Sequence, residues 1–234
     1  MKNIHYLMLK LPDTCCRATI TKLNAKHIME DILLFERIGA TNCAFAVNEE
    51  ETWDDETFDA VKDEFTKVCL YIYKKLIKME KVIRVNPITE IYSQLESARF
   101  NPTFFNGWNR CGMGTTSIGV SCDGTLHPCQ EENSSDNYVI GDVNTGIDFN
   151  KRDAYINEYF NNMKDLACSG MCSSALRYVC FNGQCPNKVM HNRGKISDTR
   201  CAYMRAIFYS VARIHKLCRA SVFPNIRDYF GEEN

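Results

Sequence analysis

The feature that most constrains this chain is a concentration of cysteines between residues 111 and 201. Eight of the thirteen cysteines fall in this stretch, namely Cys111, Cys122, Cys129, Cys168, Cys172, Cys180, Cys185 and Cys201. Disulfide frameworks, zinc sites and iron–sulfur clusters all use cysteines at such density. The function depends on which of the three applies.

Composition narrows the choice. The 234 residues are 45% hydrophobic and 24% charged, with a formal net charge of −1, which is typical of a globular protein and gives no reason to expect nucleic acid or an acidic membrane as a partner. The first residues, MKNIHYLMLKLPDTCC, lack the features of a signal peptide, and no run of about 18 apolar residues predicts a membrane span. We therefore expect a cytoplasmic protein. In a reducing compartment, and with an odd number of cysteines, disulfides are the least favoured explanation.

The first hundred residues alternate between strand-like and helix-like patterns. Ile4–Leu11 is a short apolar run that predicts a strand, and Asn24 is placed to cap a helix that ends near Ile38, before Gly39. Asn42–Val47 predicts a second strand. This order is typical of a parallel α/β sheet.

A second strand–helix unit follows. Thr52 and Asp55 have the spacing of a capping box, and the next helix repeats apolar residues from Phe58 to Leu76 at one-face spacing. Residues 82–85 predict one more strand. Two units are too few to close a barrel of about eight strands, so residues 1–105 are expected to form the remnant of a partial α/β barrel, made of parallel βα units. Residues 87–108 are expected to be a connector, and residues 106–234 a second, cysteine-rich domain.

The isolated candidates in the first half have ordinary structural explanations. Cys15 and Cys16 are neighbours that would point to opposite faces of a strand, and Cys43 and Cys69 are expected to be small core residues. The remaining candidates, His5, His27 and Trp53, are expected to have packing or structural roles.

The cysteine-rich half predicts a small α+β domain. A glycine-rich turn after Cys111 is followed by a hairpin whose two-residue turn is Asp123–Gly124, and this hairpin would return Cys129 to the side of Cys111. A helix is expected over residues 150–163, a loop up to Cys201, and a helix from Ala202. The apolar face of that last helix contains Met204, Ile207, Phe208, Val211, Ile214 and Cys218.

Spacing alone leaves two metals open. Cys168, Cys172, Cys180 and Cys185 can be arranged as two pairs around one structural zinc ion, which would leave Cys111, Cys129 and Cys201 unused. A [4Fe–4S] cluster also takes four thiolates, and its ligands can come from distant loops. Seven dispersed cysteines with few histidines among them favour iron–sulfur.

The combined pattern resembles a known family. CGMG, IGVSCDGTLHPCQE, IGDVNTGID and GQCPNK together resemble the SPASM domain, which lies at the C-terminus of radical S-adenosylmethionine enzymes that modify peptides and proteins. In that family a first cysteine precedes a G-x4-C element, here Cys111 and then Gly124 to Cys129. Pro128, the dipeptide Ile140–Gly141 and the segment 146–148 also match. The resemblance covers residues 106–205.

The resemblance implies two auxiliary [4Fe–4S] clusters. The first would be held by Cys111, Cys129 and Cys185, and the second by Cys168, Cys172, Cys180 and Cys201. The fourth ligand of the first cluster is left open. Cys122 could fill this position or be a free thiol on a turn, and the fourth iron of this cluster could instead bind a substrate or another ligand. His127 is expected to pack against the hairpin. The family's usual run of four cysteines is C-x2-C-x5-C-x3-C, whereas Cys168 to Cys185 are spaced C-x3-C-x7-C-x4-C. Because three of these four cysteines belong to the second cluster, the longer gaps make its ligand assignment less secure than that of the first.

The family's catalytic element is missing from the printed chain. Radical S-adenosylmethionine enzymes bind their catalytic cluster with C-x3-C-x2-C, but here the x3-spaced pair Cys168–Cys172 is followed by Ala175. We therefore expect either the C-terminal portion of a longer enzyme or a shortened protein, unable by itself to cleave S-adenosylmethionine. The partners that this implies are a peptide or protein substrate, a separate radical core polypeptide, and an electron donor such as a flavodoxin or ferredoxin. The alternatives are a zinc-stabilised binding module without redox activity and an inactive fragment.

Overall fold

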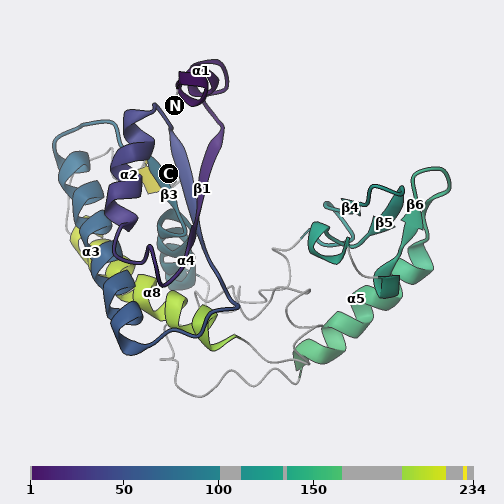
Figure 1. Cartoon of the computed structure of the whole chain (residues 1–234). Helices are drawn as coiled ribbons and strands as arrows, with labels where there is room; N and C mark the ends of the chain where they lie inside the picture. Colours follow the sequence, from purple (N-terminus) through teal and green to yellow (C-terminus); the bar gives the residue numbers. More distant parts are fainter. Residues whose placement is uncertain (1, 101–111, 134–135, 165–196, 220–228, 231–234) are drawn as a thin grey trace. The chain divides into compact units, whose positions relative to one another are not determined.

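A computed structural model describes residues 2–100, 112–133, 136–164, 197–219 and 229–230. The chain divides into two compact units. The first unit contains a parallel sheet with its helices, and the second contains a small antiparallel sheet with one helix (Figure 1). Each is described by itself below.

The first unit is built from alternating strands and helices. Strands β1 (Cys15–Ile20), β2 (Asn42–Val47) and β3 (Arg84–Asn86) lie side by side in that order and are all parallel. Helix α2 (Ile28–Arg37) connects the first two strands, and α3 (Asp55–Ile77) connects the second to the third. The expectation of parallel βα units is confirmed, including the bounds of β2, while closure into a partial barrel remains a prediction.

The core of this unit lies between the sheet and its helices. Phe45 of β2 packs edge-on against Phe65 of α3, with ring centroids 5.9 Å apart, and also contacts Phe35 of α2. The predicted face of α3 is buried from Val61 to Leu76. Cys43 and Cys69 are buried among these side chains as expected, and burial raises the pKa of both thiols well above its ordinary value.

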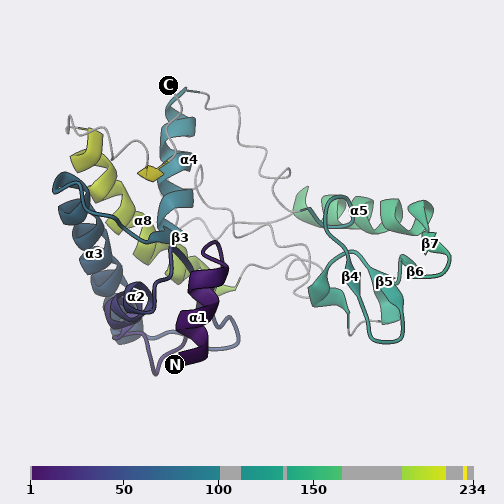
Figure 2. The same ribbon diagram turned by 90° about the horizontal axis from the view of Figure 1, so that it is seen from above.

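Helix α8 (Asp198–Arg219) completes this unit and not the cysteine-rich one (Figure 2). It packs against α3 and α4, and Tyr203 donates a hydrogen bond of 2.8 Å to the backbone oxygen of Phe45. Its predicted apolar face is buried throughout. The division at residue 105 put this helix with the second domain, because an apolar face in a sequence does not say which partner covers it.

Two expected elements of the first half are wrong. Ile4–Leu11 is not a strand, because residues Lys2–Lys10 form helix α1, in which Met8 is buried and Leu9 is exposed. Leu, Met and Lys favour a helix, and they outnumber the single β-branched residue of the run, Ile4, which favours a strand. The expected connector at residues 87–108 is also different, since helix α4 (Ile88–Phe100) follows β3 directly.

The expected helix caps are also wrong. Helix α2 begins four residues after Asn24, whose side chain instead accepts a hydrogen bond from the backbone N–H of Thr21 and donates one to the oxygen of Thr19. Helix α3 is capped by Asp54, which accepts the backbone N–H of Thr57 at 2.8 Å. The expected stop of α2 is confirmed, because Gly39 has a φ of +86° just after the helix.

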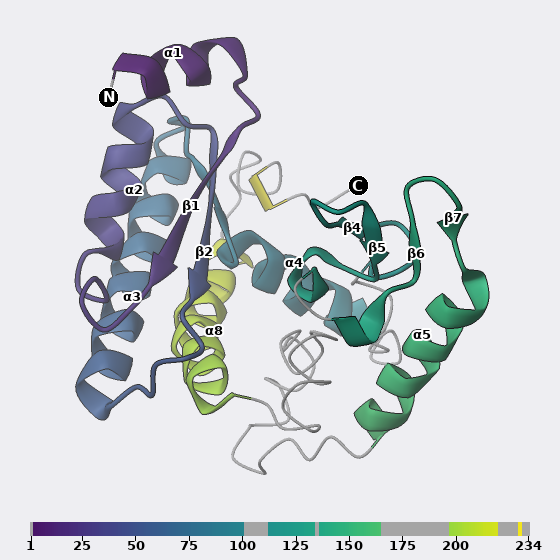
Figure 3. The ribbon, with the colours of Figure 1, turned by 45° about the vertical axis from the view of Figure 1, so that its right-hand side comes forward.

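The second unit is a four-stranded antiparallel meander and a helix (Figure 3). Its strands are β4 (Gly119–Val120), β5 (Thr125–His127), β6 (Gly141–Asp142) and β7 (Gly146–Ile147). Helix α5 (Phe149–Lys164) follows, as predicted, and the Asp148 side chain accepts the backbone N–H groups of Asn150 and Lys151 at its start. A small α+β unit is therefore present.

Candidate functional site

The predicted hairpin forms, with a longer turn than expected. Val120 pairs with Leu126, and the backbone N–H of Gly124 donates to the oxygen of Ser121 at 3.0 Å. The turn therefore has Cys122 and Asp123 at its centre and Gly124, with a φ of +89°, as the third loop residue. A three-residue loop that ends in a left-handed glycine is the next most common hairpin connection after two residues.

The turn that follows Cys111 is bonded to the residue that precedes Cys129. The oxygen of Gly112 accepts the backbone N–H groups of Thr115, Thr116 and Ser117, which closes a compact turn. From within that turn, the N–H of Gly114 donates to the oxygen of Pro128 at 2.8 Å. Cys111 itself lies outside the described residues. Gly114, three residues after it, is hydrogen-bonded to Pro128, the residue just before Cys129.

Gly119 allows its strand to lie very close to the backbone of Cys129. A Cβ atom at Gly119 would lie 2.6 Å from the oxygen of Cys129 and 2.1 Å from the Oδ1 of Asn133. Real Cβ contacts are never this short, and a backbone oxygen cannot rotate away. The half-buried Cys129 therefore has a position that only glycine at 119 allows.

Cys122 and Cys129 lie at opposite ends of this hairpin. Cys122 is exposed at the loop, whereas Cys129 follows the last pair of the ladder, His127 with Gly119. At about 3.3 Å per residue, Cys129 lies roughly 15 Å from the loop. The thiolates of one cube surround a single cluster, so the hairpin disfavours Cys122 as a ligand of the same cluster as Cys129.

Two buried side chains that are hydrogen-bonded to each other, Glu132 and Tyr155, lie close to Cys129 in the second unit. The short helix η2 (Gln130–Glu132) begins after Cys129 and ends in Glu132, whose side chain is fully buried and accepts a 2.9 Å hydrogen bond from the hydroxyl of Tyr155. Burial and the Glu132 carboxylate raise the pKa of Tyr155 well above its ordinary value, with Cys129 contributing to the same shift. A cavity of about 410 Å³ adjoins Tyr155 and is lined also by Tyr138 and Lys151. Sequence reasoning missed this pair, since QEE after a cysteine gives no signal of burial.

His127 packs as expected. It is buried within the hairpin, and its Nε2 lies 3.0 Å from the hydroxyl oxygen of Thr125. Its Nδ1 is buried and has no hydrogen-bond partner among the described residues.

Cys201 lies in the first unit, on the first turn of α8, and not at the end of a loop as expected. The helix begins at Asp198, because the Ser197 oxygen accepts the backbone N–H of Cys201 at 3.0 Å. Cys201 is half-buried.

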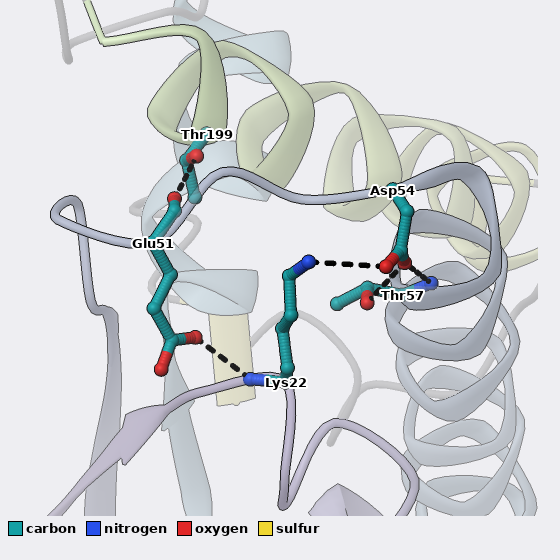
Figure 4. Close-up of polar contacts among 5 residues, drawn as sticks. All are labelled: Lys22, Glu51, Asp54, Thr57 and Thr199. Carbon is teal, nitrogen blue, oxygen red and sulfur yellow. Dashed lines mark hydrogen bonds and ion pairs between the residues drawn. The ribbon is translucent and has the colours of Figure 1, made fainter.

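The start of α8 lies at the carboxyl edge of the parallel sheet (Figure 4). The hydroxyl of Thr199 donates to the backbone oxygen of Glu51, and the Glu51 carboxylate accepts the backbone N–H of Lys22 at 2.8 Å. Lys22 in turn forms a 3.0 Å ion pair with Asp54. The segments that follow β1 and β2 are thus tied to the turn that carries Cys201, at the edge where open and closed parallel sheets bind their ligands.

The other predicted ligands, Cys111, Cys168, Cys172, Cys180 and Cys185, lie outside the described residues. Within the part that the structure describes, no three His, Cys, Asp or Glu side chains come together as a metal site. The described portion therefore supplies one expected ligand of each cluster, Cys129 and Cys201. Cys129 fits such a role, because its backbone packs closely on Gly119 and the residue is half-buried, whereas the exposed Cys122 does not share its end of the hairpin.

Comparison with known proteins adds no assignment. No protein-family model matches the chain, and no curated protein matches it. Among the described helices, none combines the length and apolar character needed to cross a membrane. A family assignment therefore rests on the cysteine pattern and on the local geometry above.

Proposed function

We propose that this chain is the auxiliary [4Fe–4S]-binding, C-terminal portion of a radical S-adenosylmethionine peptide or protein maturase. The observation that carries the proposal is the 2.8 Å hydrogen bond from Gly114 to Pro128, which joins the segments that contain the first two cysteines of the SPASM-like pattern. Two cysteines separated by seventeen residues can share a cluster only if the chain between them folds back. The hairpin provides that fold.

The ligand sets follow the resemblance. Cys111, Cys129 and Cys185 would hold the first cluster, and Cys168, Cys172, Cys180 and Cys201 the second. Such clusters accept and release single electrons, at potentials set by nearby charge, hydrogen bonds and solvent exposure. Gly119 leaves room for the backbone of Cys129, and the turn on Gly112 holds the adjoining segment. The buried Glu132 adds a negative charge beside the first site.

The proposed role is to relay electrons or to position a peptide substrate. Cleavage of S-adenosylmethionine would require a polypeptide with the C-x3-C-x2-C element, and an electron donor such as a flavodoxin or ferredoxin would supply reducing equivalents. We place this function in the cytoplasm, where thiols such as Cys15, Cys16 and Cys122, none of them in a disulfide, remain reduced.

Metal analysis tests the proposal. The chain purified without oxygen is expected to contain about eight iron and eight sulfide ions, as two cubes require. Substitution Cys129→Ser should remove about half of the iron, and Cys201→Ser should remove the other half. Cys122→Ser is the matched control, because it changes a cysteine of the same hairpin and should leave the iron content unchanged.

The same measurement discriminates the zinc alternative. One or two zinc ions with no sulfide would identify a zinc-stabilised module instead. Iron that is unaffected by Cys129→Ser would contradict the assignment of the first cluster.

A further inference from the structure

One ring nitrogen of His127 is buried without a hydrogen-bond partner. His127 is the last residue of β5 and only 2% exposed. Its Nδ1 atom is buried and has no hydrogen-bond partner among the described residues. Leaving a buried polar atom unpaired costs free energy, so such atoms are rare and indicate a bound water, an ion or a reactive role. The Nδ1 atom therefore needs an explanation beyond packing.

Hydrogen bonds on the other side of the ring determine which nitrogen carries the proton. Backbone and side-chain hydrogen bonds from Thr125 lower the pKa of Asp123, so this carboxyl group is ionised and only accepts. The Thr125 hydroxyl donates its single proton to Asp123 at 2.7 Å. Its oxygen, 3.0 Å from Nε2 of His127, must then accept from that nitrogen. Nε2 carries the N–H, and Nδ1 has a lone pair in the neutral ring.

This arrangement is typical of a metal-binding histidine. An imidazole that binds a metal usually donates its other ring N–H to an acceptor, which sets the orientation of the ring. His127 donates to Thr125 and, through that hydroxyl, is connected to the Asp123 carboxylate. The ring is thus held by one nitrogen while the other presents a lone pair.

Cys129 lies on the same face of the chain as His127. The backbone stays extended beyond β5, since Cys129 has a φ of −153° and a ψ of 169°. In an extended chain, residues two apart point to the same face, with their Cα atoms roughly 7 Å apart. The contact of His127 with Thr125, two residues earlier, follows the same alternation. His127 and Cys129 are therefore directed to one side of the hairpin.

We propose that Nδ1 of His127 is the fourth ligand of the first [4Fe–4S] cluster, beside the thiolates of Cys111, Cys129 and Cys185. This inference rests on the proposed function, in which one iron of that cluster has no assigned ligand. Histidine replaces cysteine in some iron–sulfur centres and raises their reduction potential. A neutral imidazole in place of a thiolate makes the cluster one charge less negative, so it accepts an electron more readily.

Other candidates for this position satisfy fewer observations. Cys122 is exposed at the loop end of the hairpin, away from Cys129. The Glu132 carboxylate is buried but accepts the hydroxyl of Tyr155. An iron that is open to a substrate would leave the lone pair of His127 unused.

Nitrogen hyperfine spectroscopy tests the assignment with the full chain. The chain is purified without oxygen, with ordinary histidine or with histidine labelled by the heavy nitrogen isotope, and its reduced clusters are measured by pulsed electron paramagnetic resonance. A bound imidazole nitrogen is expected to give a coupling that changes with the isotope. The coupling should disappear in His127→Phe, which keeps a ring without a ligand atom. His27→Phe, at an exposed position of the first unit, is the control and should retain it.

His127→Cys separates ligation from packing. Because Nδ1 is the ring nitrogen nearer the backbone, a cysteine sulfur reaches nearly the same place, so iron and sulfide content should match the parent while the nitrogen coupling is lost. The midpoint potential of that cluster should fall, since a thiolate adds negative charge. A histidine with only a packing role would give no coupling and no change in potential. If His127→Phe does not fold, the labelled parent and His127→Cys provide the test.

Two results would overturn this ligand. One is a pair of clusters without an isotope-sensitive coupling, and the other is a coupling that survives in His127→Phe and is lost in His191→Phe, at a position outside the described residues. Metal content is measured on the same samples. Full iron and sulfide without the coupling would leave the proposed function intact and remove only His127 as a ligand. Zinc in place of iron would remove the function itself.

Discussion

At the scale of single residues, the side chain that caps the start of α2 is Glu64 and not Asn24, which the sequence predicts for this role. Its buried carboxylate, on α3, accepts the backbone N–H of Met29 at 2.9 Å in the first turn of α2, where His27 forms no side-chain cap. A cap supplied by another helix is invisible in a local sequence pattern, which explains why the predicted N-cap of α2, Asn24, lies three residues before the observed one, His27.

Removing this cap should destabilise the first unit. Glu64→Ala is expected to lower the free energy of unfolding by about 2 kcal/mol, because it leaves the part-buried N–H of Met29 without its cap. Glu64→Gln keeps an acceptor oxygen and should lose less than half as much. Chemical denaturation of both variants measures the difference. The ion pair with the exposed Lys67 contributes little, so Lys67→Met is the control, and an equal loss in that variant would contradict the cap.

Glu132 is expected to tune the first proposed cluster. A buried negative charge disfavours adding an electron nearby, so it lowers the reduction potential. Glu132→Gln keeps the hydrogen bond from Tyr155 and removes the charge, and the midpoint potential of one cluster should rise by on the order of 50 mV. A redox titration followed by electron paramagnetic resonance measures this shift. Glu158→Gln, on α5, is the control, and the same shift in both variants would argue against a specific effect of Glu132.

At the scale of elements, the sequence correctly predicts helices and strands that have a long apolar pattern or clear turn residues at both ends. The buried stripe of α3 and the apolar face of α8 extend over several turns, and β2 is bounded by turn residues on both sides, so these three agree with the structure. Helix α1 is only nine residues, too short for its pattern to separate helix from strand. The start of α8 was placed late because Cys201 was assigned to a ligand loop and not to the first helical turn.

The cap of α3 gives a pH-dependent prediction. The hydroxyl and N–H of Thr57, with Lys22, hold the pKa of Asp54 well below its ordinary value. A lowered folded-state pKa stabilises the protein at pH values above the unfolded pKa of about 3.9, and this contribution is lost as pH falls below it. Asp54→Ala should therefore be destabilised at pH 7, and its deficit should shrink toward pH 3. Thermal melts at both pH values measure it.

Asp54→Asn is the matched variant, because its side-chain oxygen can still accept from Thr57. Its stability relative to the parent should improve as pH falls, since the neutral cap does not titrate. A deficit of Asp54→Ala that is constant with pH would assign the effect to lost packing and not to the charged cap.

At the scale of the whole molecule, the sequence identified a cysteine-rich half and a βα half but not how the chain is shared between them. The unit boundary near residue 105 is local and leaves a composition change in the sequence. The return of α8 to the first unit is a long-range contact, fixed by pairs such as Thr66 with Ser210, 2.9 Å apart, and by the Tyr203 hydrogen bond to β2. No local pattern encodes such a pairing.

This return predicts which truncations fold. Helix α8 buries Ile207 and Val211 completely, and Tyr203 packs edge-on to Phe65 of α3 with ring centroids 6.1 Å apart. A chain cut after residue 104 would expose that face of α3 and leave the Phe45 end of the sheet uncovered. It should lack a cooperative unfolding transition, whereas the same fragment joined by a flexible linker to residues 197–230 should regain one. Circular dichroism melts of the two fragments decide between α8 as a structural part of the first unit and α8 as an appendage. A cooperative transition in the shorter fragment would place the whole core within residues 2–100 and make the helix dispensable.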